Sequence, residues 1–285
     1  MFCAINNIMN NDWSLHFKIT NWCNLNCAHC CECSNSSQPL NLMPLEKIEK
    51  YLKETTDMPI KPDELISIGG GEVMAPYMHN NPDYIPKLLD LLYKYNFVPT
   101  LKTNGTWGEQ HKKSAQILSG IAKCAYKSGK LVTLDISVDE FHNNTNSVAK
   151  IIRNVVNDYY LCYAIRICLV GFYTQKSKNA LLRLKQELSK FGFRTETMPP
   201  FDDWIISAPN GNTTVLYNSF TSGIFDIGRA KQNKVYTATD KDSAYDHCLQ
   251  IDNDDIATYN YNHQEPVQNR NLYEVLCSLQ QRARK

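Results

Sequence analysis

The sequence lacks three features that would direct it to a membrane, to secretion or to nucleic acid. It has no run of about 18 apolar residues and no signal-peptide core at its beginning. Its net charge is only +1, so it has no basic excess with which to neutralise phosphates. A protein that depends on phosphate contacts usually has such an excess, which disfavours nucleic acid as a partner. Together these absences predict a soluble, cytoplasmic protein with no membrane partner.

Cysteine, in contrast, is plentiful. The chain of 285 residues contains 11 cysteines. Disulfides are rare in the cytosol, and an odd number of cysteines agrees with thiols that act as ligands. The hydrophobic content of 43% is sufficient for a large core, either one domain or one domain with an appendage.

Three cysteines are crowded on one short loop. Cys23, Cys27 and Cys30 have CxxxCxxC spacing directly after a predicted strand. Iron–sulfur clusters and structural zinc sites usually take four protein ligands. A compact trio without an obvious fourth ligand leaves one metal corner open, which favours an iron–sulfur cluster over a zinc knuckle. Unrelated buried cysteines are the alternative, because free cysteine is commonly buried. Cys31 and Cys33 are interpreted as loop residues near the substrate.

Strand patterns alternate with amphipathic helical patterns over the first 200 residues. The predicted strands are 14–20, 64–68, 97–102, 131–138, 163–170 and 193–198, and the predicted helices are 44–54, 83–95, 109–127, 145–159 and 176–191. This alternation predicts right-handed parallel units. The expected fold class is α/β, with a partial (β/α)6 TIM-like barrel over residues 1–200. In such barrels the chemistry lies at the carboxyl ends of the strands.

The pattern changes in the last part of the chain. Residues 201–285 contain short strand-like pieces and no further β-α unit, so they are expected to form a small C-terminal α+β extension. A hairpin is predicted over residues 248–259, with a cluster of Asn and Asp residues as its turn. A final helix is predicted over residues 271–284.

A glycine-rich turn follows the second predicted strand. Gly69, Gly70 and Gly71 precede Glu72, and glycines permit a close approach of two backbones. On its own this run is compatible with an ordinary turn. In combination with the cysteine trio, it resembles the paired motifs of the radical S-adenosylmethionine (SAM) enzymes.

The resemblance implies a cofactor set. It implies one [4Fe-4S] cluster on Cys23, Cys27 and Cys30, with SAM bound to the open iron. Gly70, Gly71 and Glu72 match the positions that meet the amino group of SAM in this family. His29 matches the family's aromatic position near the adenine.

The fourth predicted strand contributes polar residues to the interior. Asp135, Ser137 and Asp139 share one face of this strand. Helices cover the outside of a barrel, so this face should point into its lumen. Ser137 and Asp139 resemble the family's ribose-binding pair. His142, just beyond the strand, is a candidate substrate contact or proton-transfer group, with an ordinary loop histidine as the alternative.

Two further candidates come from the neighbouring strands. Asn104 follows the third strand on the inward face. Arg166, on the fifth strand, is a candidate for binding the carboxylate of SAM or of a substrate, because a guanidinium matches a carboxylate in a bidentate manner. The alternative is an internal salt bridge of Arg166 with Asp135 or Glu196.

The extension carries a tripeptide of interest. Gly228, Arg229 and Ala230 resemble a tripeptide that follows the barrel in peptide-modifying members with SPASM or twitch extensions. Those extensions bind auxiliary clusters through additional cysteines. Only Cys248 and Cys277 stand in suitable places here, so we expect a degenerate extension without an auxiliary cluster, in which both cysteines pack.

The resemblance implies an iron–sulfur oxidoreductase. The cluster would cleave SAM reductively to a 5′-deoxyadenosyl radical that abstracts hydrogen from a substrate C–H bond. An external donor such as flavodoxin or ferredoxin would supply the electron. The favoured substrate is a ribosomally synthesised peptide, and the alternative is a small metabolite such as a sugar, nucleoside or amino acid. Retention of all three cysteines argues against an inactive SAM-binding relic.

Overall fold

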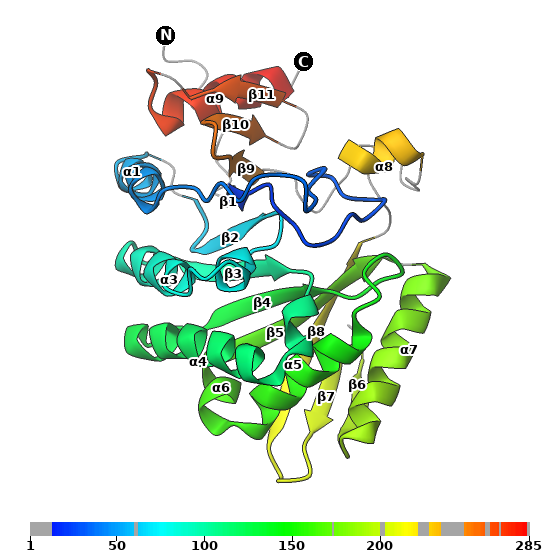
Figure 1. The fold of residues 1–285 in the computed structure, drawn as a ribbon. Coiled ribbons are helices and arrows are strands. Elements are labelled where there is room, and N and C mark those ends of the chain that lie inside the picture. The colour runs from blue at the N-terminus through cyan, green and yellow to red at the C-terminus, as the bar shows by residue number, and fades with distance from the viewer. Residues whose placement is uncertain are drawn as a thin grey trace.

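The protein forms one continuous twisted sheet with a helical layer (Figure 1). The computed structural model describes residues 13–59, 62–172, 174–199, 203–221, 228–234, 248–259, 263–267 and 269–283. The strand order is β11-β10-β9-β1-β2-β3-β4-β5-β8-β7-β6. The strands are β1 (Ser14–Thr20), β2 (Leu65–Gly70), β3 (Val98–Thr103), β4 (Val132–Ser137), β5 (Ile165–Phe172), β6 (Arg194–Met198), β7 (Asp203–Ser207), β8 (Thr213–Thr221), β9 (Cys248–Ile251), β10 (Ile256–Tyr259) and β11 (His263–Pro266).

The helices alternate with the central strands. They are α1 (Leu45–Thr56), α2 (Ala75–Met78), α3 (Tyr84–Lys94), the 3-10 turn η2 (Thr106–Glu109), α4 (His111–Ser128), α5 (Thr145–Asn157), α6 (Tyr159–Ala164), α7 (Gln175–Lys190), α8 (Gly228–Asn233) and α9 (Leu272–Ala283). Their apolar stripes supply the core together with the outer faces of the strands. Ile48 and Leu52 of α1 and Leu88 of α3, for example, are fully buried. This confirms the α/β class and leaves the polar faces of the strands for the inner side.

The parallel part of the sheet runs from β9 through β1, β2, β3, β4 and β5 to β8. Its register aligns Lys102 with Asp135, and Asp135 with Cys168. Because side chains alternate between the two faces of a strand, these aligned residues point to the same inner side. The inner wall is therefore polar, as the pattern of the fourth strand predicts.

The sixth parallel strand is not the one that the sequence pattern indicates. The predicted strand 193–198 is β6, which pairs only with β7, in antiparallel orientation, at the edge of the sheet. The neighbour of β5 is β8. The polar side chains of β6, such as the exposed Arg194 and Glu196, suit an edge strand that faces solvent. The division of the chain at residue 200 stays a prediction, although the sheet itself continues across it.

The last 85 residues contribute to both edges of the sheet. β7 and β8 extend it beyond β5, while β9, β10 and β11 extend it beyond β1. The predicted hairpin is confirmed, since β9 and β10 pair in antiparallel orientation. Asp252 Oδ1 closes its turn by accepting the N–H groups of Asp254 and Ile256, each at 2.9 Å. The predicted final helix is α9, which packs through the fully buried Leu272, Val275 and Leu279.

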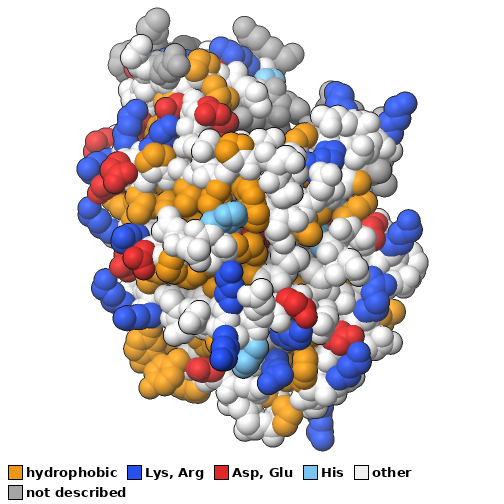
Figure 2. Space-filling view, in the orientation of Figure 1, with side chains coloured by type: hydrophobic (Ala, Val, Ile, Leu, Met, Phe, Trp, Pro, Cys, Tyr) orange, Lys and Arg blue, Asp and Glu red, His pale blue; other side chains and the backbone are white. Residues whose placement is uncertain are grey.

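The surface agrees with the near-neutral composition. On the face seen in Figure 2, basic and acidic side chains are interspersed and not separated by sign. In the described part of the chain, every helix is too short or too polar to span a bilayer.

Candidate active site

The carboxyl ends of the central strands surround a cavity of about 250 Å³. Residues from β1 to β5 and from the loops that follow β1, β2, β3 and β4 meet there. The predicted residues that line it are Cys23, Cys27, His29, Cys30, Gly70, Gly71, Asn104, Ser137, Asp139 and His142. Glu72 and Arg166 are the predicted site residues that do not. Below these groups His16, Lys102 and Asp135 add a polar wall.

The cysteine loop leaves β1 with its thiols partly buried. Cys23 Sγ accepts hydrogen bonds from the backbone N–H of Leu25 at 3.4 Å and from the side-chain amide of Asn104 at 3.6 Å. Burial raises the pKa of Cys23 to about 12, and burial also raises the pKa of Cys30. Burial therefore disfavours the thiolate form, which is the form that binds a metal, at both residues.

Gly70 and Gly71 allow the end of β2 to lie against the start of the cysteine loop. A Cβ atom on Gly71 would lie 1.9 Å from the carbonyl oxygen of Trp22, and Gly70 has a φ of +107°. The backbone N–H of Gly71 donates to Thr20 at 2.7 Å, and that of Glu72 donates to Trp22 at 2.8 Å. Side chains at these two positions would separate the two motifs.

Glu72 acts within the protein and does not face the cavity. Its side chain is 1% exposed. One carboxylate oxygen accepts the hydroxyl of Thr103 at 2.6 Å and the N–H of Met74 at 2.9 Å, and the other accepts the N–H of Asn104 at 2.8 Å. Burial raises the pKa of Glu72, and these three hydrogen bonds oppose the shift. Glu72 thus fixes the ends of β2 and β3 relative to each other.

Two histidines and a carboxylate form the opposite wall. His142 Nδ1 lies 2.8 Å from Asp139 Oδ1, which also accepts the N–H of Phe141 at 2.8 Å. Burial alone would lower the pKa of His142, but hydrogen bonds with Asp139 and Cys27 raise it to about 10. The imidazole of His29 completes the group, because ligand atoms of all three side chains lie within 4.8 Å of one another.

His29 lies in an aromatic pocket that the sequence reasoning missed. Its ring centroid is 4.3 Å from that of Phe141 and 5.2 Å from that of Phe172. Burial lowers the pKa of His29 to about 4, and its buried Nδ1 atom has no hydrogen-bond partner among the described residues. A neutral ring with an unused polar atom suits a flat ligand with hydrogen-bonding groups. The signal in the sequence is that Phe141 lies just beyond β4 and Phe172 is the last residue of β5, so both are at the carboxyl ends of neighbouring parallel strands.

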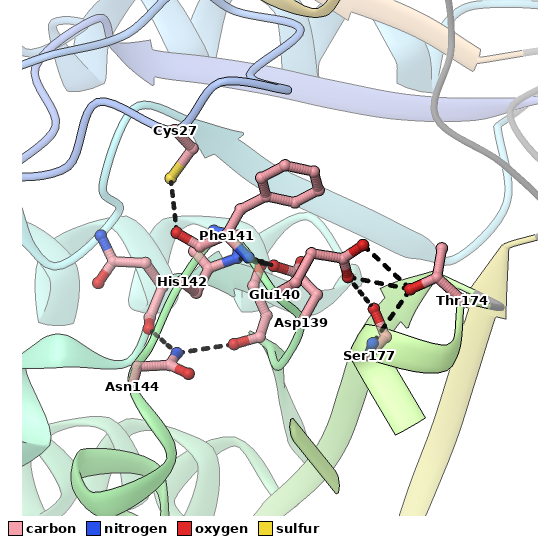
Figure 3. A network of polar contacts seen from close by, with 10 residues as sticks. Cys27, Asp139, Glu140, Phe141, His142, Asn144, Thr174 and Ser177 are labelled. Atoms are coloured by element: carbon pink, nitrogen blue, oxygen red, sulfur yellow. Dashed lines mark hydrogen bonds and ion pairs between the residues drawn. The ribbon is translucent and has the colours of Figure 1, made fainter. Parts of the chain in front are cut away.

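A polar network supports this wall from behind (Figure 3). The side-chain amide of Asn144 donates to the backbone carbonyls of Ser137, at 2.7 Å, and Asn104. Glu140 accepts the hydroxyls of Thr174, at 3.0 Å, and Ser177, so it joins the end of β4 to the start of α7. Asn144 and Glu140 were not predicted, because supporting residues of this kind follow no spacing rule.

Arg166 is placed away from the cavity. It is exposed near the beginning of β5, and its guanidinium lies 5.2 Å from the centre of the Tyr217 ring. The cavity residues of the same strand, Val170 and Phe172, are at its carboxyl end. The structure therefore does not bring Arg166 to a SAM carboxylate, and its contact is a cation–π pair.

Comparisons with known proteins give partial matches. No family model matches the chain. A putative peptide biosynthesis protein, YydG of Bacillus subtilis (strain 168), is 32% identical over 122 residues, which cover 42% of this chain and 34% of that protein. The aligned region is therefore about a third of the length of this relative.

Two solved structures are among the matches to this chain. SuiB of Streptococcus suis bound to the precursor peptide SuiA is 11% identical, with a TM-score of 0.46 over 93% of this chain and 64% of SuiB. Native anSMEcpe with bound AdoMet and Cp18Cys peptide is 18% identical, with a TM-score of 0.40 over 62% of this chain and 48% of that chain.

The fold and the cavity define an α/β protein with three cysteine thiols at a cavity beside the carboxyl ends of parallel strands. The CxxxCxxC loop, the Gly-Gly-Glu turn packed against it and the Ser137/Asp139 pair occur together in one site. This arrangement agrees with the resemblance of the sequence to the radical SAM enzymes.

Proposed function

We propose that this protein is a radical SAM enzyme that cleaves SAM reductively and abstracts hydrogen from a C–H bond of a peptide during its maturation. The observation that carries the proposal is the convergence of the three thiols with Gly70, Gly71 and the Ser137/Asp139 pair on one cavity. These groups lie up to 116 positions apart in the sequence, from Cys23 to Asp139. Ordinary core packing does not require polar and thiol groups to converge in this way.

The donor set fits a [4Fe-4S] cluster. Cys23, Cys27 and Cys30 would hold it as three soft ligands, and no fourth cysteine of the described cavity lining has the same spacing. When bound, the cluster supplies the electron that cleaves SAM to methionine and a 5′-deoxyadenosyl radical. The protein's own residues shape the loop, and Asn104 donates a hydrogen bond to Cys23.

The remaining residues of the cavity fit SAM. His29 Nδ1, which has no hydrogen-bond partner in the described part of the chain, and the adjoining Phe141 and Phe172 rings offer a place for adenine. Ser137 and Asp139 lie on the same side and would hold the ribose, with His142 keeping the Asp139 carboxylate in place. Their part in the reaction is to orient SAM and to exclude water from the reacting carbon.

The peptide substrate is proposed from the sequence relative, whose name describes peptide biosynthesis. A small metabolite is the second candidate, and the observation that favours it is the polar inner wall of His16, Lys102 and Asp135. Purified enzyme supplied with SAM, reductant and a short peptide encoded beside its gene separates the two. A mass change in the peptide supports the first candidate, whereas SAM cleavage that only a sugar, nucleoside or amino acid stimulates supports the second.

The cluster itself is tested by substitution. Cys27→Ala should abolish formation of 5′-deoxyadenosine under reductant, while Cys162→Ala, on the outer helix α6, should retain it. Continued production in Cys27→Ala would remove the trio from the mechanism. Reconstituted protein should hold about four irons per chain. Roughly eight would refute the proposal that the extension lacks an auxiliary cluster.

An external low-potential donor, a flavodoxin or a ferredoxin, would supply the electron. A cytoplasmic location, where thiols stay reduced, belongs to the same proposal. To test the donor, the purified protein is mixed with reduced flavodoxin, and the spectrum of the protein's iron shows whether the cluster becomes reduced.

A further inference from the structure

Arg229 lies on α8, about 200 positions from the cysteine loop, and yet contacts it directly. Its guanidinium donates to the backbone carbonyl of Cys27 at 2.7 Å and to that of Ser34 at 2.8 Å. Its backbone N–H donates to the carbonyl of Cys30 at 2.8 Å. One residue therefore binds three carbonyls of the segment that carries the thiols.

The rest of α8 supports the same contact. Asn233 donates its side-chain amide to the carbonyl of Ala28 at 3.0 Å, and Gln232 Nε2 lies 3.9 Å from Cys33 Sγ. Ala230 is fully buried and anchors the short helix. Figure 1 shows α8 beside the loop that follows β1.

The cysteine loop needs such external support. Cys33 adopts a φ of 52°, which is unfavourable for a residue with a side chain. The N–H of Cys23 donates to Asn35 at 3.2 Å and closes the loop at its base. Between these two residues, the N–H of Cys30 donates to Cys27 at 3.2 Å and that of Cys33 donates to Cys30 at 3.4 Å, and both are turn contacts. A guanidinium is a rigid planar fork, so it fixes the separation of two carbonyls in a way that an ammonium cannot.

Arg229 also brings a positive charge to the thiols. Its guanidinium lies 2.7 Å from the carbonyl oxygen of Cys27, and its backbone N–H lies 2.8 Å from that of Cys30, so the charge stands beside the segment that carries two of the thiols. Cluster potentials depend on the net charge around the cluster and on its hydrogen bonds. A cation beside the loop should therefore stabilise the more negative, reduced state.

We propose that Arg229 is a positioning residue of the cluster site, which fixes the CxxxCxxC loop through its fork and favours the reduced cluster through its charge. The inference rests on the cluster-binding part of the proposed function. It gives the Gly228-Arg229-Ala230 tripeptide a role in holding the loop that carries Cys23, Cys27 and Cys30.

Three variants of the full chain separate the fork from the charge. Arg229→Gln removes both, Arg229→Lys keeps the charge, and Arg183→Gln removes an exposed arginine of α7 as a control. Each is reconstituted anaerobically, and the rate of iron loss to a chelator and the midpoint potential by electron paramagnetic resonance are measured. Loss of a supporting residue typically weakens metal binding about 10- to 100-fold.

Arg229→Gln should lose iron about tenfold faster than the wild type and have a more negative midpoint potential. Arg229→Lys should lose iron faster than the wild type but keep its potential, and Arg183→Gln should match the wild type in both. A wild-type rate or a wild-type potential in Arg229→Gln would overturn the proposal.

If circular dichroism shows that Arg229→Gln is unfolded, Arg229→Lys decides the outcome, because a wild-type rate of iron loss in that variant overturns the role of the fork. A wild-type protein that takes up no iron would instead refute the proposed function. The two failures are therefore distinguishable.

Discussion

The side-chain amide of Asn104, at the end of β3, donates a hydrogen bond to the Sγ atom of Cys23 at 3.6 Å. Asn104 is itself held firmly, since its side-chain N–H group also donates to Asn24 Oδ1 at 2.9 Å and its side-chain Oδ1 accepts the hydroxyl of Thr106 at 2.6 Å. The donor is thus aimed at the sulfur by a rigid environment. Hydrogen bonds to the ligand sulfurs are one of the factors that set the potential of a cluster.

Asn104→Ala should make the midpoint potential of the cluster more negative, because the reduced cluster loses a donor to Cys23. A hydrogen bond contributes about 1 kcal/mol net, which corresponds to roughly 40 mV for one electron. A redox titration followed by electron paramagnetic resonance measures the shift. Asn154→Ala is the control, because Asn154 bonds to Ser114 on the outer helices. Equal potentials in the two variants would show that the contact does not tune the cluster.

Gly71→Ala should prevent assembly of the metal site. The added Cβ atom would lie 1.9 Å from the carbonyl oxygen of Trp22, so the start of the cysteine loop must move. We expect reconstituted Gly71→Ala to retain less than about a tenth of the wild-type iron. Gly129→Ala is the control, because Gly129 has a φ of +68° but a Cβ atom there would meet nothing within 4 Å. That control should lose about 1 kcal/mol of stability and keep its iron. Normal iron content in Gly71→Ala would contradict the packing argument.

Much of the site follows from local patterns in the sequence. Strand periodicity places Asp135, Ser137 and Asp139 on one inner face, and the register of the sheet confirms it. The cysteine spacing and the glycine turn are short motifs that each follow a strand. Because these two strands are parallel neighbours, the motifs at their carboxyl ends lie side by side. These features depend on contacts within a few residues or on the period of a strand.

The features that the sequence did not predict depend on long-range pairing. β6 follows a helix and so resembles the next barrel strand, yet β8 pairs with β5. The charged side chains of β6 indicate an edge strand. The prediction of a sixth barrel strand used only the order of strands and helices, which does not distinguish an edge strand from a central one. The contact of Arg229 with Cys27 likewise joins residues 202 positions apart, and no periodicity relates them.

His16 should make the protein sensitive to acid. Burial, and then the charges of Lys102 and Lys18, lower the pKa of His16 to about 3. Between pH 3 and about 6.5 the unfolded chain binds a proton that the folded protein does not, so stability rises with pH across this window. For this group alone, the free energy of unfolding should be about 2 kcal/mol lower at pH 5 than at pH 7.

Urea unfolding of His16→Gln at the two pH values tests this effect. The variant should lose about 2 kcal/mol less than the wild type between pH 7 and pH 5, because glutamine does not titrate. His111→Gln, at the exposed start of α4, should lose as much as the wild type. The same pH dependence in His16→Gln and the wild type would show that the imidazole is not buried in its neutral form.

Arg166→Ala should leave SAM binding unchanged, although the sequence pattern makes Arg166 a candidate for the SAM carboxylate. Arg166 is exposed and lies over the Tyr217 ring at 5.2 Å, so its removal should lower the free energy of unfolding by only about 0.5–1 kcal/mol. Asp139→Asn is the informative comparison, because Asp139 lines the cavity and is 3% exposed. Calorimetric titration with SAM should give a wild-type dissociation constant for Arg166→Ala and one raised about tenfold for Asp139→Asn, the loss of roughly one charge-assisted hydrogen bond. A tenfold loss of affinity in Arg166→Ala would instead mean that β5 turns its amino end toward the ligand when SAM binds.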